Sequence, residues 1–383
     1  MSEADRPALA RDVAGLREIV ARWRQEGARV ALVPTMGALH AGHISLIERA
    51  RAEAERVVVS IFVNPTQFSP SEDFSKYPRT FAADLEKLRA AAADLCFAPD
   101  VAGMYGQGFA TTILVDGPAK ADLEDHFRPT HFTGVATIVA KLLIQAQADV
   151  AMFGEKDYQQ LLVVRRMATD LDIPTRIVGA PTLREADGLA MSSRNVYLSS
   201  AERSRATALY RALQEAAARI NGGDCIGEAM RAATETVVRA GFEIDYLEAR
   251  HAETLARIAD PGAGPIRLLV AARLGATRLI DNIAVAQMAR KVVRLKITGR
   301  VQGVGFRAFV ADEAERRGLS GWVRNRADRS VEAVIAGEDA MVDEMAEVCR
   351  RGPYGARVEN VAIEAADMSD LGERSDFTML RTL

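Results

Sequence analysis

Two histidines and two glycines stand close together in the segment PTMGALHAGH, residues 34–43. His40 and His43 are three residues apart, a spacing that places them on one face where a helix begins. A helix N-terminus attracts anions through its N–H groups and its dipole, and Gly37 and Gly42 permit close backbone approach. The segment therefore predicts a phosphate-binding turn. On spacing alone, a metal site or a pair of polar capping residues remains an alternative, and the chain has no P-loop motif.

A second candidate for anion binding is TGRVQGVGFR, residues 298–307. Gly299, Gly303 and Gly305 lie between an expected strand and an expected helix, and such a turn can direct several N–H groups at one anion. Arg307 follows at the helix start, where its guanidinium suits a bidentate phosphate contact. The alternative is a tight connection that carries an exposed arginine.

Three further segments that are typical of turns carry side chains with hydrogen-bonding or charged groups. They are Gln67 in NPTQF, Lys156 in GEKD and Arg194 in MSSR, where Ser192 and Ser193 add hydroxyl groups. Taken singly, Gln67 would be a solvent-facing loop residue and Lys156 a surface lysine. Their significance depends on their occurring together.

The elements that must position these residues alternate between strands and helices through residue 180. Short apolar runs predict strands at 30–33, 57–63, 95–98, 111–115, 150–153 and 176–179. Apolar stripes predict helices at 44–55, 82–93, 134–147 and 158–171. Repeated alternation of this kind predicts an α/β fold with a Rossmann-like, doubly wound parallel sheet, whose ligands bind beyond the carboxyl ends of the strands.

Two smaller units are expected after this sheet. Residues 199–240 are Ala-rich and helical, and strands are predicted at 244–248, 266–272 and 279–284, which together make a small α+β unit. From residue 292 the pattern becomes β-α-β-β-α-β, which is the ferredoxin-like arrangement. The expected domains are therefore residues 1–180, 181–288 and 291–383.

Composition excludes several classes of function. The chain has 383 residues, 49% of them apolar, and a net charge of −3, which argues against a general nucleic-acid-binding protein. No apolar run approaches the roughly 18 residues of a membrane span, and the polar start MSEADRPALARD lacks a signal core. We expect a cytoplasmic protein without membrane contact. Cys96, Cys225 and Cys349 show no metal-binding spacing and are expected to be reduced thiols.

Several motifs occur in the order found in the pantothenate synthetases, the pantoate–β-alanine ligases. PTMGALHAGHISLI resembles the HIGH-type nucleotide motif of that family. After it come, in family order, FVNPTQF (62–68), YPRT (77–80), RPTHFTGV (128–135), FGEKDYQQ (153–160) and READGLAMSSRN (184–195). The resemblance covers roughly residues 10–288, and it implies a nucleotidyltransferase-type parallel-sheet domain.

The resemblance implies a two-step ligation. The carboxylate of (R)-pantoate attacks the α-phosphorus of ATP to give pantoyl adenylate and pyrophosphate, and the amine of β-alanine then displaces AMP to give pantothenate. A carboxylate must approach a polyanion, so the site needs cations and hydrogen-bond donors. Mg²⁺ is implied as well, held mostly by ATP and water because no dedicated carboxylate cage is visible. The family also implies a homodimer.

By similarity, the ATP site has seventeen members, of which His40, His43, Lys156 and Arg194 are also the expected catalytic residues. His43 matches the family's proton donor, Lys156 the residue that grips the phosphates, and Asp157 a residue near the ribose or the metal. The full set is Met36, Gly37, Ala38, Leu39, His40, Ala41, Gly42, His43, Gly154, Glu155, Lys156, Asp157, Leu183, Met191, Ser192, Ser193 and Arg194.

Gln67 and Gln160 match the glutamines that bind pantoate in the family. An amide suits a small hydroxy acid because it offers a donor and an acceptor. Gln67 is expected near β-alanine too. Asn64 and Tyr77 are further candidates for substrate contact.

The C-terminal unit resembles acylphosphatase over roughly residues 291–370, through GRVQGVGFR followed by GWVRNR (321–326). The resemblance implies hydrolysis of an acyl phosphate without a metal, in which Arg307 binds the phosphoryl group and Asn325 orients the attacking water. The backbone N–H groups that stabilise the developing charge would be those of Gln302, Gly303, Val304, Gly305 and Phe306. One departure is Arg329 after Asp328, where the family often has a glycine that accepts positive φ, and it puts the geometry of this hairpin in question.

Three interpretations remain at this point. The presence of Arg307 and Asn325 favours a bifunctional enzyme, a ligase fused to an acyl-phosphate hydrolase. The first alternative keeps the ligase but makes the C-terminal unit a binding or regulatory domain, because a fold alone does not imply activity. The second alternative, a transferase that moves AMP onto another nucleotide, is opposed by the two glutamines.

Overall fold

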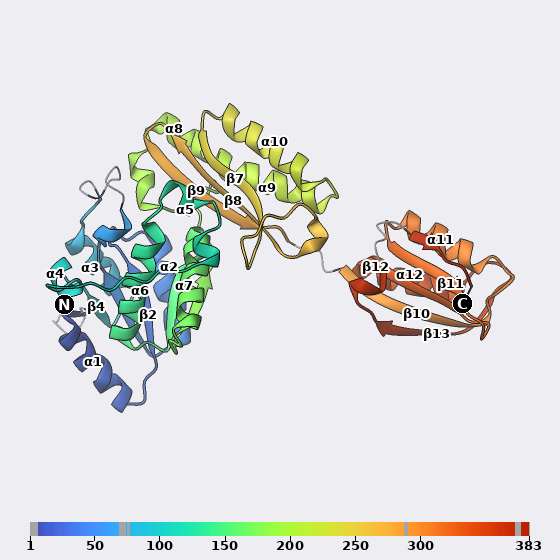
Figure 1. Ribbon diagram of the computed structural model, residues 1–383, viewed down its shortest axis with the longest axis horizontal. Helices are drawn as coiled ribbons and strands as arrows, with labels where there is room; N and C mark the ends of the chain where they lie inside the picture. Colours follow the sequence, from blue (N-terminus) through green and yellow to red (C-terminus); the bar gives the residue numbers. More distant parts are fainter. Residues whose placement is uncertain (1–6, 69–73, 75–76, 287–289, 372–376, 383) are drawn as a thin grey trace. The chain divides into compact units, whose positions relative to one another are not determined.

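The computed structural model describes residues 7–68, 74, 77–286, 290–371 and 377–382. The chain forms two compact units, Met1–Ala286 and Gln287–Leu383 (Figure 1). The expected boundary at residue 288 lies outside the described residues, and the expected division of the first unit at residue 180 remains a prediction. Within the described ranges, no helix is long and apolar enough to cross a membrane.

Six parallel strands form the main sheet of the first unit, in the order β1-β4-β3-β2-β5-β6. The chain adds strands on one side of β2 and then continues with β5 on its other side. The strand order therefore reverses between β2 and β5, which is where ligands bind in doubly wound sheets. This confirms the predicted Rossmann-like class. The strands are β1 (Ala8–Ala10), β2 (Val30–Thr35), β3 (Arg56–Ile61), β4 (Leu95–Phe97), β5 (Val150–Gly154) and β6 (Arg176–Ala180).

Helices cover both faces of this sheet. Residues of α1 (Val13–Gln25), α6 (His131–Ala146) and α7 (Tyr158–Asp170) share a core with Leu32 and Phe153. On the other face, α2 (Ala41–Glu53) and α3 (Phe81–Ala90) pack against Val33 and Met152. Strands buried on both faces carry continuous apolar runs, which is why they were predictable. Shorter pieces connect these elements: η2 (Pro65–Gln67), α4 (Val101–Met104), η3 (Gly117–Ala119), α5 (Glu124–Phe127) and η4 (Glu155–Asp157).

The predicted strand at residues 111–115 is wrong. The segment has no strand assignment, and within the described residues its backbone contact is the N–H of Ile113, which donates to Thr137 Oγ1 at 2.9 Å. A β-branched run suits a strand, but a strand also needs a neighbouring edge, and among the described residues no strand pairs with this segment. Strand β1 and helix α1 were not predicted from the sequence. β1 has three residues, too few to show a pattern, whereas α1 carried a signal in its cap, Asp12, which accepts from the Gly15 N–H at 2.8 Å.

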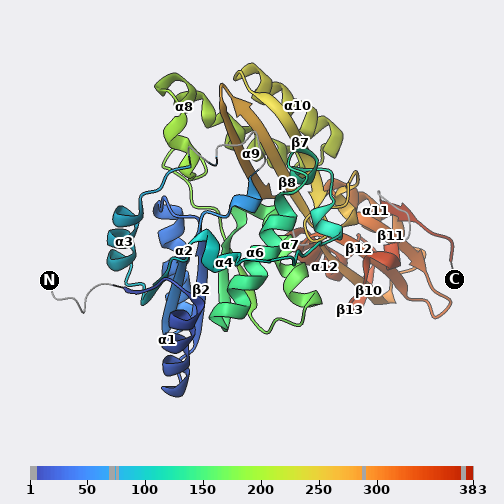
Figure 2. The same cartoon turned by 60° about the vertical axis from the view of Figure 1, so that its left-hand side comes forward.

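Residues 181–286 form the expected α+β arrangement. Its antiparallel sheet has the order β7-β8-β9. Two helices, α9 and α10, lie side by side against this sheet (Figure 2), and Leu213 of α9 shares a core with Val270 of β8. The elements are η5 (Ser193–Tyr197), α8 (Ser200–Ala206), α9 (Ala208–Asn221), α10 (Ile226–Arg239), β7 (Glu243–His251), η6 (Pro261–Ala263), β8 (Ile266–Leu274) and β9 (Thr277–Ala284).

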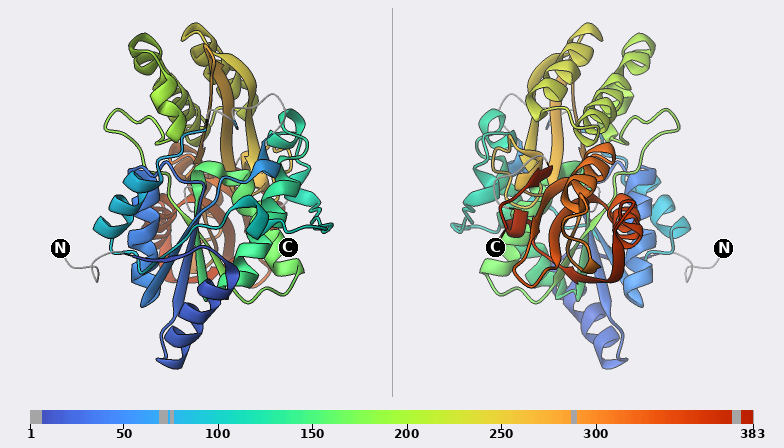
Figure 3. Two further views of the ribbon diagram at one scale, coloured as in Figure 1. Left: turned by 90° about the vertical axis from the view of Figure 1, so that its left-hand side faces the viewer. Right: turned by 90° about the vertical axis from the view of Figure 1, so that its right-hand side faces the viewer.

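The second unit follows the predicted β-α-β-β-α-β order and adds a short edge strand, β14, that was not predicted. The sheet order is β13-β10-β12-β11-β14, and β14 runs parallel to β11. Helices α11 and α12 pack on the same face of this sheet (Figure 3). The elements are β10 (Arg290–Arg300), α11 (Phe306–Arg316), β11 (Ser320–Asn325), β12 (Val331–Glu338), α12 (Asp339–Arg351), β13 (Arg357–Ala365), η7 (Met368–Leu371) and β14 (Phe377–Met379).

Candidate active sites

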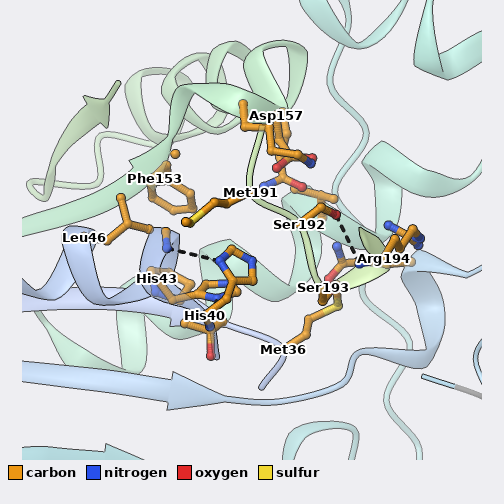
Figure 4. A pocket seen from close by; sticks show the side chains of 18 of the residues that line it. Met36, His40, His43, Leu46, Phe153, Asp157, Met191, Ser192, Ser193 and Arg194 are labelled. Atoms are coloured by element: carbon orange, nitrogen blue, oxygen red, sulfur yellow. Dashed lines mark hydrogen bonds between the residues drawn. The ribbon is translucent and has the colours of Figure 1, made fainter. Parts of the chain in front are cut away.

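A cavity of about 230 Å³ lies in the first unit, where the strand order reverses between β2 and β5. Figure 4 shows His40 and His43 on one part of its wall and Ser192, Ser193 and Arg194 on another. Most of the site residues expected from the sequence line this one cavity. They are Met36, His40, Gly42, His43, Gln67, Tyr77, Gly154, Lys156, Asp157, Gln160, Leu183, Met191, Ser192, Ser193 and Arg194.

Six expected residues are absent from the cavity wall: Gly37, Ala38, Leu39, Ala41, Asn64 and Glu155. The segment before α2 is held from behind by the buried Asp84, whose carboxylate accepts the N–H groups of Ala38 (3.0 Å) and Leu39 (2.8 Å). Leu39 is buried in the core on that side. These residues shape the turn, whereas Met36 and the two histidines face the cavity.

The two histidines cap α2 in a reciprocal way. His40 is the N-cap, and its Nδ1 accepts from the Gly42 N–H at 3.1 Å. His43 is the third helical residue, and its Nδ1 accepts from the His40 N–H at 3.3 Å. A ring nitrogen that accepts carries no proton, so the neutral rings hold their protons on Nε2. Capping thus fixes both tautomers and leaves each Nε2–H for another acceptor.

Burial and nearby positive charge keep both rings neutral at neutral pH. Burial, followed by Lys156 and Lys87, lowers the pKa of His40 from 6.5 to about 4. Burial, followed by His40 and Lys156, lowers the pKa of His43 to about 3. Such values favour hydrogen-bond donation over proton transfer. The positive charge of the cavity therefore comes from lysine and arginine.

Lys156 supplies one of these charges. It lies in η4, the turn between β5 and α7, and lines the cavity beside Asp157. Among the described residues, its ammonium group has no hydrogen-bond or ion-pair partner. A second charge is on Arg194, in a turn closed by Ser192 Oγ, which accepts the Arg194 N–H at 3.2 Å.

Gln67 is held by a dense local network. The buried Asn64 donates through Nδ2 to Gln67 Oε1 (3.0 Å) and to the Gly134 carbonyl (3.3 Å), and its Oδ1 accepts from Thr66 and Tyr105. Both polar atoms of the Asn64 side chain are therefore bonded to other residues of the protein. Asn64 supports Gln67 in this way. Gly134 is required here because a Cβ atom would lie 2.4 Å from the Thr66 carbonyl oxygen.

Arg128 and His131 also line the cavity, although neither was predicted as a site residue. Arg128 Nη2 donates to the backbone carbonyl oxygen of Gln67 at 3.1 Å, and His131 Nδ1 lies 3.0 Å from the same oxygen. The signal was present in the RPTHFTGV motif, which contains both residues. Arg128 is in turn 3.6 Å from Glu124.

Glu124 connects this region to the β7-β8-β9 sheet. Its carboxylate accepts from two nitrogens of Arg278 (2.9 and 2.7 Å) and from Tyr246 Oη (2.9 Å). Burial alone would raise the pKa of Glu124, but the hydrogen bonds and charge of Arg278, with the charge of Arg128, hold it below its usual value. A buried, paired carboxylate of this kind fixes the positions of its partners.

The second candidate site is formed by the segment between β10 and α11. Gln302 Nε2 donates to the carbonyls of Arg326 (2.9 Å) and Ser330 (2.8 Å), which ties the segment to the hairpin after Asn325. Gly303 and Gly305 have φ of 76°, a left-handed conformation that glycine adopts without strain. In the described part of the chain, the backbone N–H groups of residues 302–306 have no protein acceptor.

Arg307 and Asn325 are both half-buried, Arg307 in helix α11 and Asn325 in strand β11. Arg307 is the second residue of α11, directly after the glycine-rich segment. Asn325 is the last residue of β11 and pairs with Val331, which also pairs with Ile297 of β10. The predicted pair is therefore brought to the end of the sheet where the segment begins.

The hairpin between β11 and β12 closes despite Arg329. The Arg326 N–H donates to the Ser330 carbonyl at 2.9 Å, and Arg329 takes φ of 65°. Asp328 accepts from the Ser330 N–H at 3.0 Å and pairs with Lys296 at 2.9 Å. The hairpin thus keeps the conformation that favours glycine, with an arginine in a strained position.

Comparison with known proteins agrees with the motifs. The pantoate-beta-alanine ligase family matches residues 8–284, and the acylphosphatase family matches residues 293–379. A pantothenate synthetase from Rhodopseudomonas palustris is 60% identical over 279 residues, which are 73% of this chain and 99% of the relative.

Solved structures also resemble the first unit. Pantothenate synthetase from Thermus thermophilus has 50% identity and a TM-score of 0.69, covering 73% of this chain and 99% of its own. Pantoate-beta-alanine ligase from Francisella tularensis, complexed with beta-gamma ATP and beta-alanine, has 32% identity and a TM-score of 0.60, covering 73% of this chain and 97% of its own.

The doubly wound sheet and the donor-lined cavity at its reversal point define a nucleotide-binding α/β enzyme. The chain belongs to the pantoate–β-alanine ligase family, the pantothenate synthetases, and carries an acylphosphatase domain after the ligase. Membership of this family argues against the transferase alternative.

Proposed function

We propose that the first unit condenses (R)-pantoate with β-alanine through a pantoyl-adenylate intermediate, with ATP as the second substrate. The observation that carries the proposal is the single cavity in which Gln67 and Gln160 meet the histidine pair, Lys156 and Ser192–Arg194. The F. tularensis relative, solved with beta-gamma ATP and beta-alanine, supports these substrates.

In the first step, a pantoate carboxylate oxygen attacks the α-phosphorus and pyrophosphate leaves. The amides of Gln67 and Gln160 hold the hydroxy acid, and the Nε2–H groups of His40 and His43 donate to phosphate oxygens. Lys156 and Arg194 offset the negative charge that builds up on the phosphates. Neutral imidazoles suit this role because each presents one directed N–H group.

In the second step, the β-alanine amine attacks the acyl carbon, and AMP leaves with the oxygen that joined the two groups. Arg128 and His131 contact the backbone carbonyl of Gln67, and Arg128 is the cation that we assign to the β-alanine carboxylate. A magnesium ion would be held mostly by ATP and water, because Asp157 is the only carboxylate among the described residues lining the cavity. Bound there, the ion would neutralise phosphate charge.

An isotope experiment tests the adenylate. Pantoate labelled with ¹⁸O in its carboxylate should transfer one labelled oxygen to AMP, detected by mass spectrometry. AMP release should require ATP, pantoate and β-alanine together. Label that appears in inorganic phosphate alongside ADP would contradict the proposed intermediate.

We propose further that the second unit hydrolyses acyl phosphates. Five consecutive backbone N–H groups without protein acceptors in the described part of the chain, next to Arg307 and Asn325, form an anion-binding segment with a positioned amide. Arg307 and the N–H groups hold the phosphoryl oxygens, and Asn325 orients the attacking water. Water attacks phosphorus, the bond between phosphorus and the acyl oxygen breaks, and the carboxylate leaves, so that the products are the carboxylate and inorganic phosphate.

Benzoyl phosphate, assayed without a metal, tests this activity. Hydrolysis by the full chain is the expected result. Release of AMP without hydrolysis would instead make the second unit a binding or regulatory domain.

By family resemblance we also propose that the chain forms a homodimer. Light scattering coupled to size-exclusion chromatography should give about twice the mass of 41.5 kDa. A monomer mass would contradict this proposal.

A further inference from the structure

Two consecutive residues of β9, Asp281 and Asn282, hold the segments that bring positive charge to the first cavity. They are called the β9 pair below. Both are buried, with 4% and 3% of their surface exposed. They come from the sheet at residues 243–284, well after Arg194 in the chain, and no motif of the sequence analysis includes them.

Asn282 holds the turn that carries Lys156. Its Nδ2 donates to the carbonyls of Glu155 (2.9 Å) and Lys156 (2.8 Å), so both amide protons are used. Its Oδ1 accepts from Arg267 Nε at 2.6 Å. A carboxylate or an alkyl group in this position cannot supply two donors.

Arg267 supports the same turn from a second direction. Its Nη2 lies 3.2 Å from Glu155 Oε2, and its guanidinium stacks 4.0 Å from the ring of Tyr158, the first residue of α7. The backbone of residues 155–158 is thus fixed from β8 and β9. Its fixed position sets where the Lys156 ammonium group enters the cavity.

Asp281 holds the other charged arm. Its carboxylate accepts from Arg184 Nη1 (2.6 Å) and Nη2 (2.9 Å), and Arg184 Nη1 also donates to the Gly188 carbonyl at 3.1 Å. Arg184 pairs with Ala190 in a small bridge, and the Met191 N–H donates to the Leu183 carbonyl at 3.0 Å. This bridge leads directly into Ser192–Arg194.

We propose that the β9 pair positions the reacting phosphates: Asn282 and Asp281 together set the spacing between Lys156 and the Ser192–Arg194 turn. Asn282 is a positioning residue, because it acts through the backbone of Lys156. The inference rests on the proposed ligase reaction, and it adds that the small antiparallel sheet determines phosphate geometry in the cavity of the large one. A misplacement of about 1 Å in such a site costs roughly 100-fold in rate.

The test compares Asn282→Ala and Asn282→Asp with the wild-type full chain. Asn282→Asp keeps the size and the contact with Arg267 but removes both donors. Either variant should lower kcat/KM for ATP by about 100-fold, while KM for pantoate changes by less than about threefold. Calorimetric titration should show weakened binding of a non-hydrolysable ATP analogue but unchanged binding of adenosine, which has no phosphates.

Val237→Ala in α10 is the matched control for stability. Val237 is fully buried in the core that β8 shares with α9 and α10, far in the chain from the cavity residues. It should lower the melting temperature and leave kcat/KM for ATP unchanged. Asp281→Asn provides a second variant if Asn282→Ala does not fold. It too should weaken binding of the ATP analogue more than binding of adenosine.

Two results would overturn the proposal. One is a folded Asn282→Asp or Asp281→Asn protein with kcat/KM for ATP within about threefold of wild type. The other is an equal loss of binding affinity for the ATP analogue and for adenosine. Because wild type and Val237→Ala are assayed together, absence of AMP release from both would count against the ligase function itself and not only against the β9 pair.

Discussion

The two candidate phosphate sites of this chain are built in opposite ways. The first draws its groups from residues 36–194, with support from residues 267–282, and relies on side chains: two neutral imidazoles, a lysine, an arginine and two amides. The second takes most of its groups from residues 302–307 and relies on backbone N–H groups, with Arg307 and one asparagine added.

The difference reflects what each proposed reaction requires. Joining three substrates requires separate subsites, and separate subsites need elements that converge from distant parts of the chain. Hydrolysis of one acyl phosphate needs a single anion-binding turn and one positioned water. The first site should therefore be sensitive to distant contacts, and the second to its local turn and to Arg307.

The largest expected effect separates the two sites completely. Arg307→Ala should reduce benzoyl phosphate hydrolysis by about 10³-fold or more, because removing a positioned arginine from a phosphoryl-transfer site costs that much. AMP release by the same protein should be unchanged. Arg316→Ala, on the exposed end of the same helix, is the control and should retain both activities. Hydrolysis that survives Arg307→Ala would show that this site is wrong.

The reciprocal change tests the first site. Lys156→Met should lower AMP release by about 10²- to 10³-fold, because a cation that offsets phosphate charge is lost. Hydrolysis of benzoyl phosphate should stay at the wild-type rate. Lys120→Met replaces an exposed lysine paired with Asp116 and should alter neither activity. Equal loss in the two lysine variants would remove the special role of Lys156.

Acid should distinguish the two units through histidine. All five histidines of the chain precede residue 287, and the pKa values of His40 and His43, about 4 and 3, lie below that of an unfolded histidine. Between pH 6.5 and about 4, these two histidines bind more protons in the unfolded chain than in the folded chain. Their contribution to the free energy of unfolding is therefore complete above pH 6.5 and decreases as the pH falls.

Differential scanning calorimetry measures this contribution. The melting temperature of the first unit should fall as the pH decreases from 6.5 to about 4, and His43→Gln should reduce that fall. The rate of acyl phosphate hydrolysis should show no histidine titration over the same pH range, because the second unit contains no histidine. An unchanged pH dependence in His43→Gln would mean that the ring is not held neutral by its surroundings.

The smallest expected effect concerns the hairpin at the second site. Arg329 adopts φ of 65°, a conformation that costs an L-residue roughly 1–2 kcal/mol. Arg329→Gly should therefore stabilise the second unit by about 1 kcal/mol and leave hydrolysis within about twofold of wild type. Asp328→Gly, which removes the contacts to Ser330 and Lys296, should destabilise the unit instead. Chemical unfolding measures both changes when the fluorescence of Trp322 is followed in a protein that also carries Trp23→Phe, because Trp23 is the second tryptophan of the chain.

Much of the fold was predictable because its signals are local. Strands buried on both faces showed continuous apolar runs, and the β-α-β-β-α-β order of the second unit was visible in its periodicity. The strand expected at residues 111–115 failed because pairing depends on a neighbour that a local pattern does not reveal. β1 and β14 were missed because three residues carry no period.

The sequence by itself determined the family, the order of the motifs and the identity of most groups that line the first cavity. Only the tertiary structure decided which of them face the cavity. Asp84 accepts the Leu39 N–H outside the cavity, Asn64 donates to the Gln67 side chain, and Arg128 donates to the Gln67 backbone carbonyl. It also decided that the histidines are neutral and that Asn282 holds the turn of Lys156. The physical reason is that burial, charge and hydrogen bonds between distant segments arise only when the chain is folded, whereas capping residues and glycine turns act within a few positions of one another.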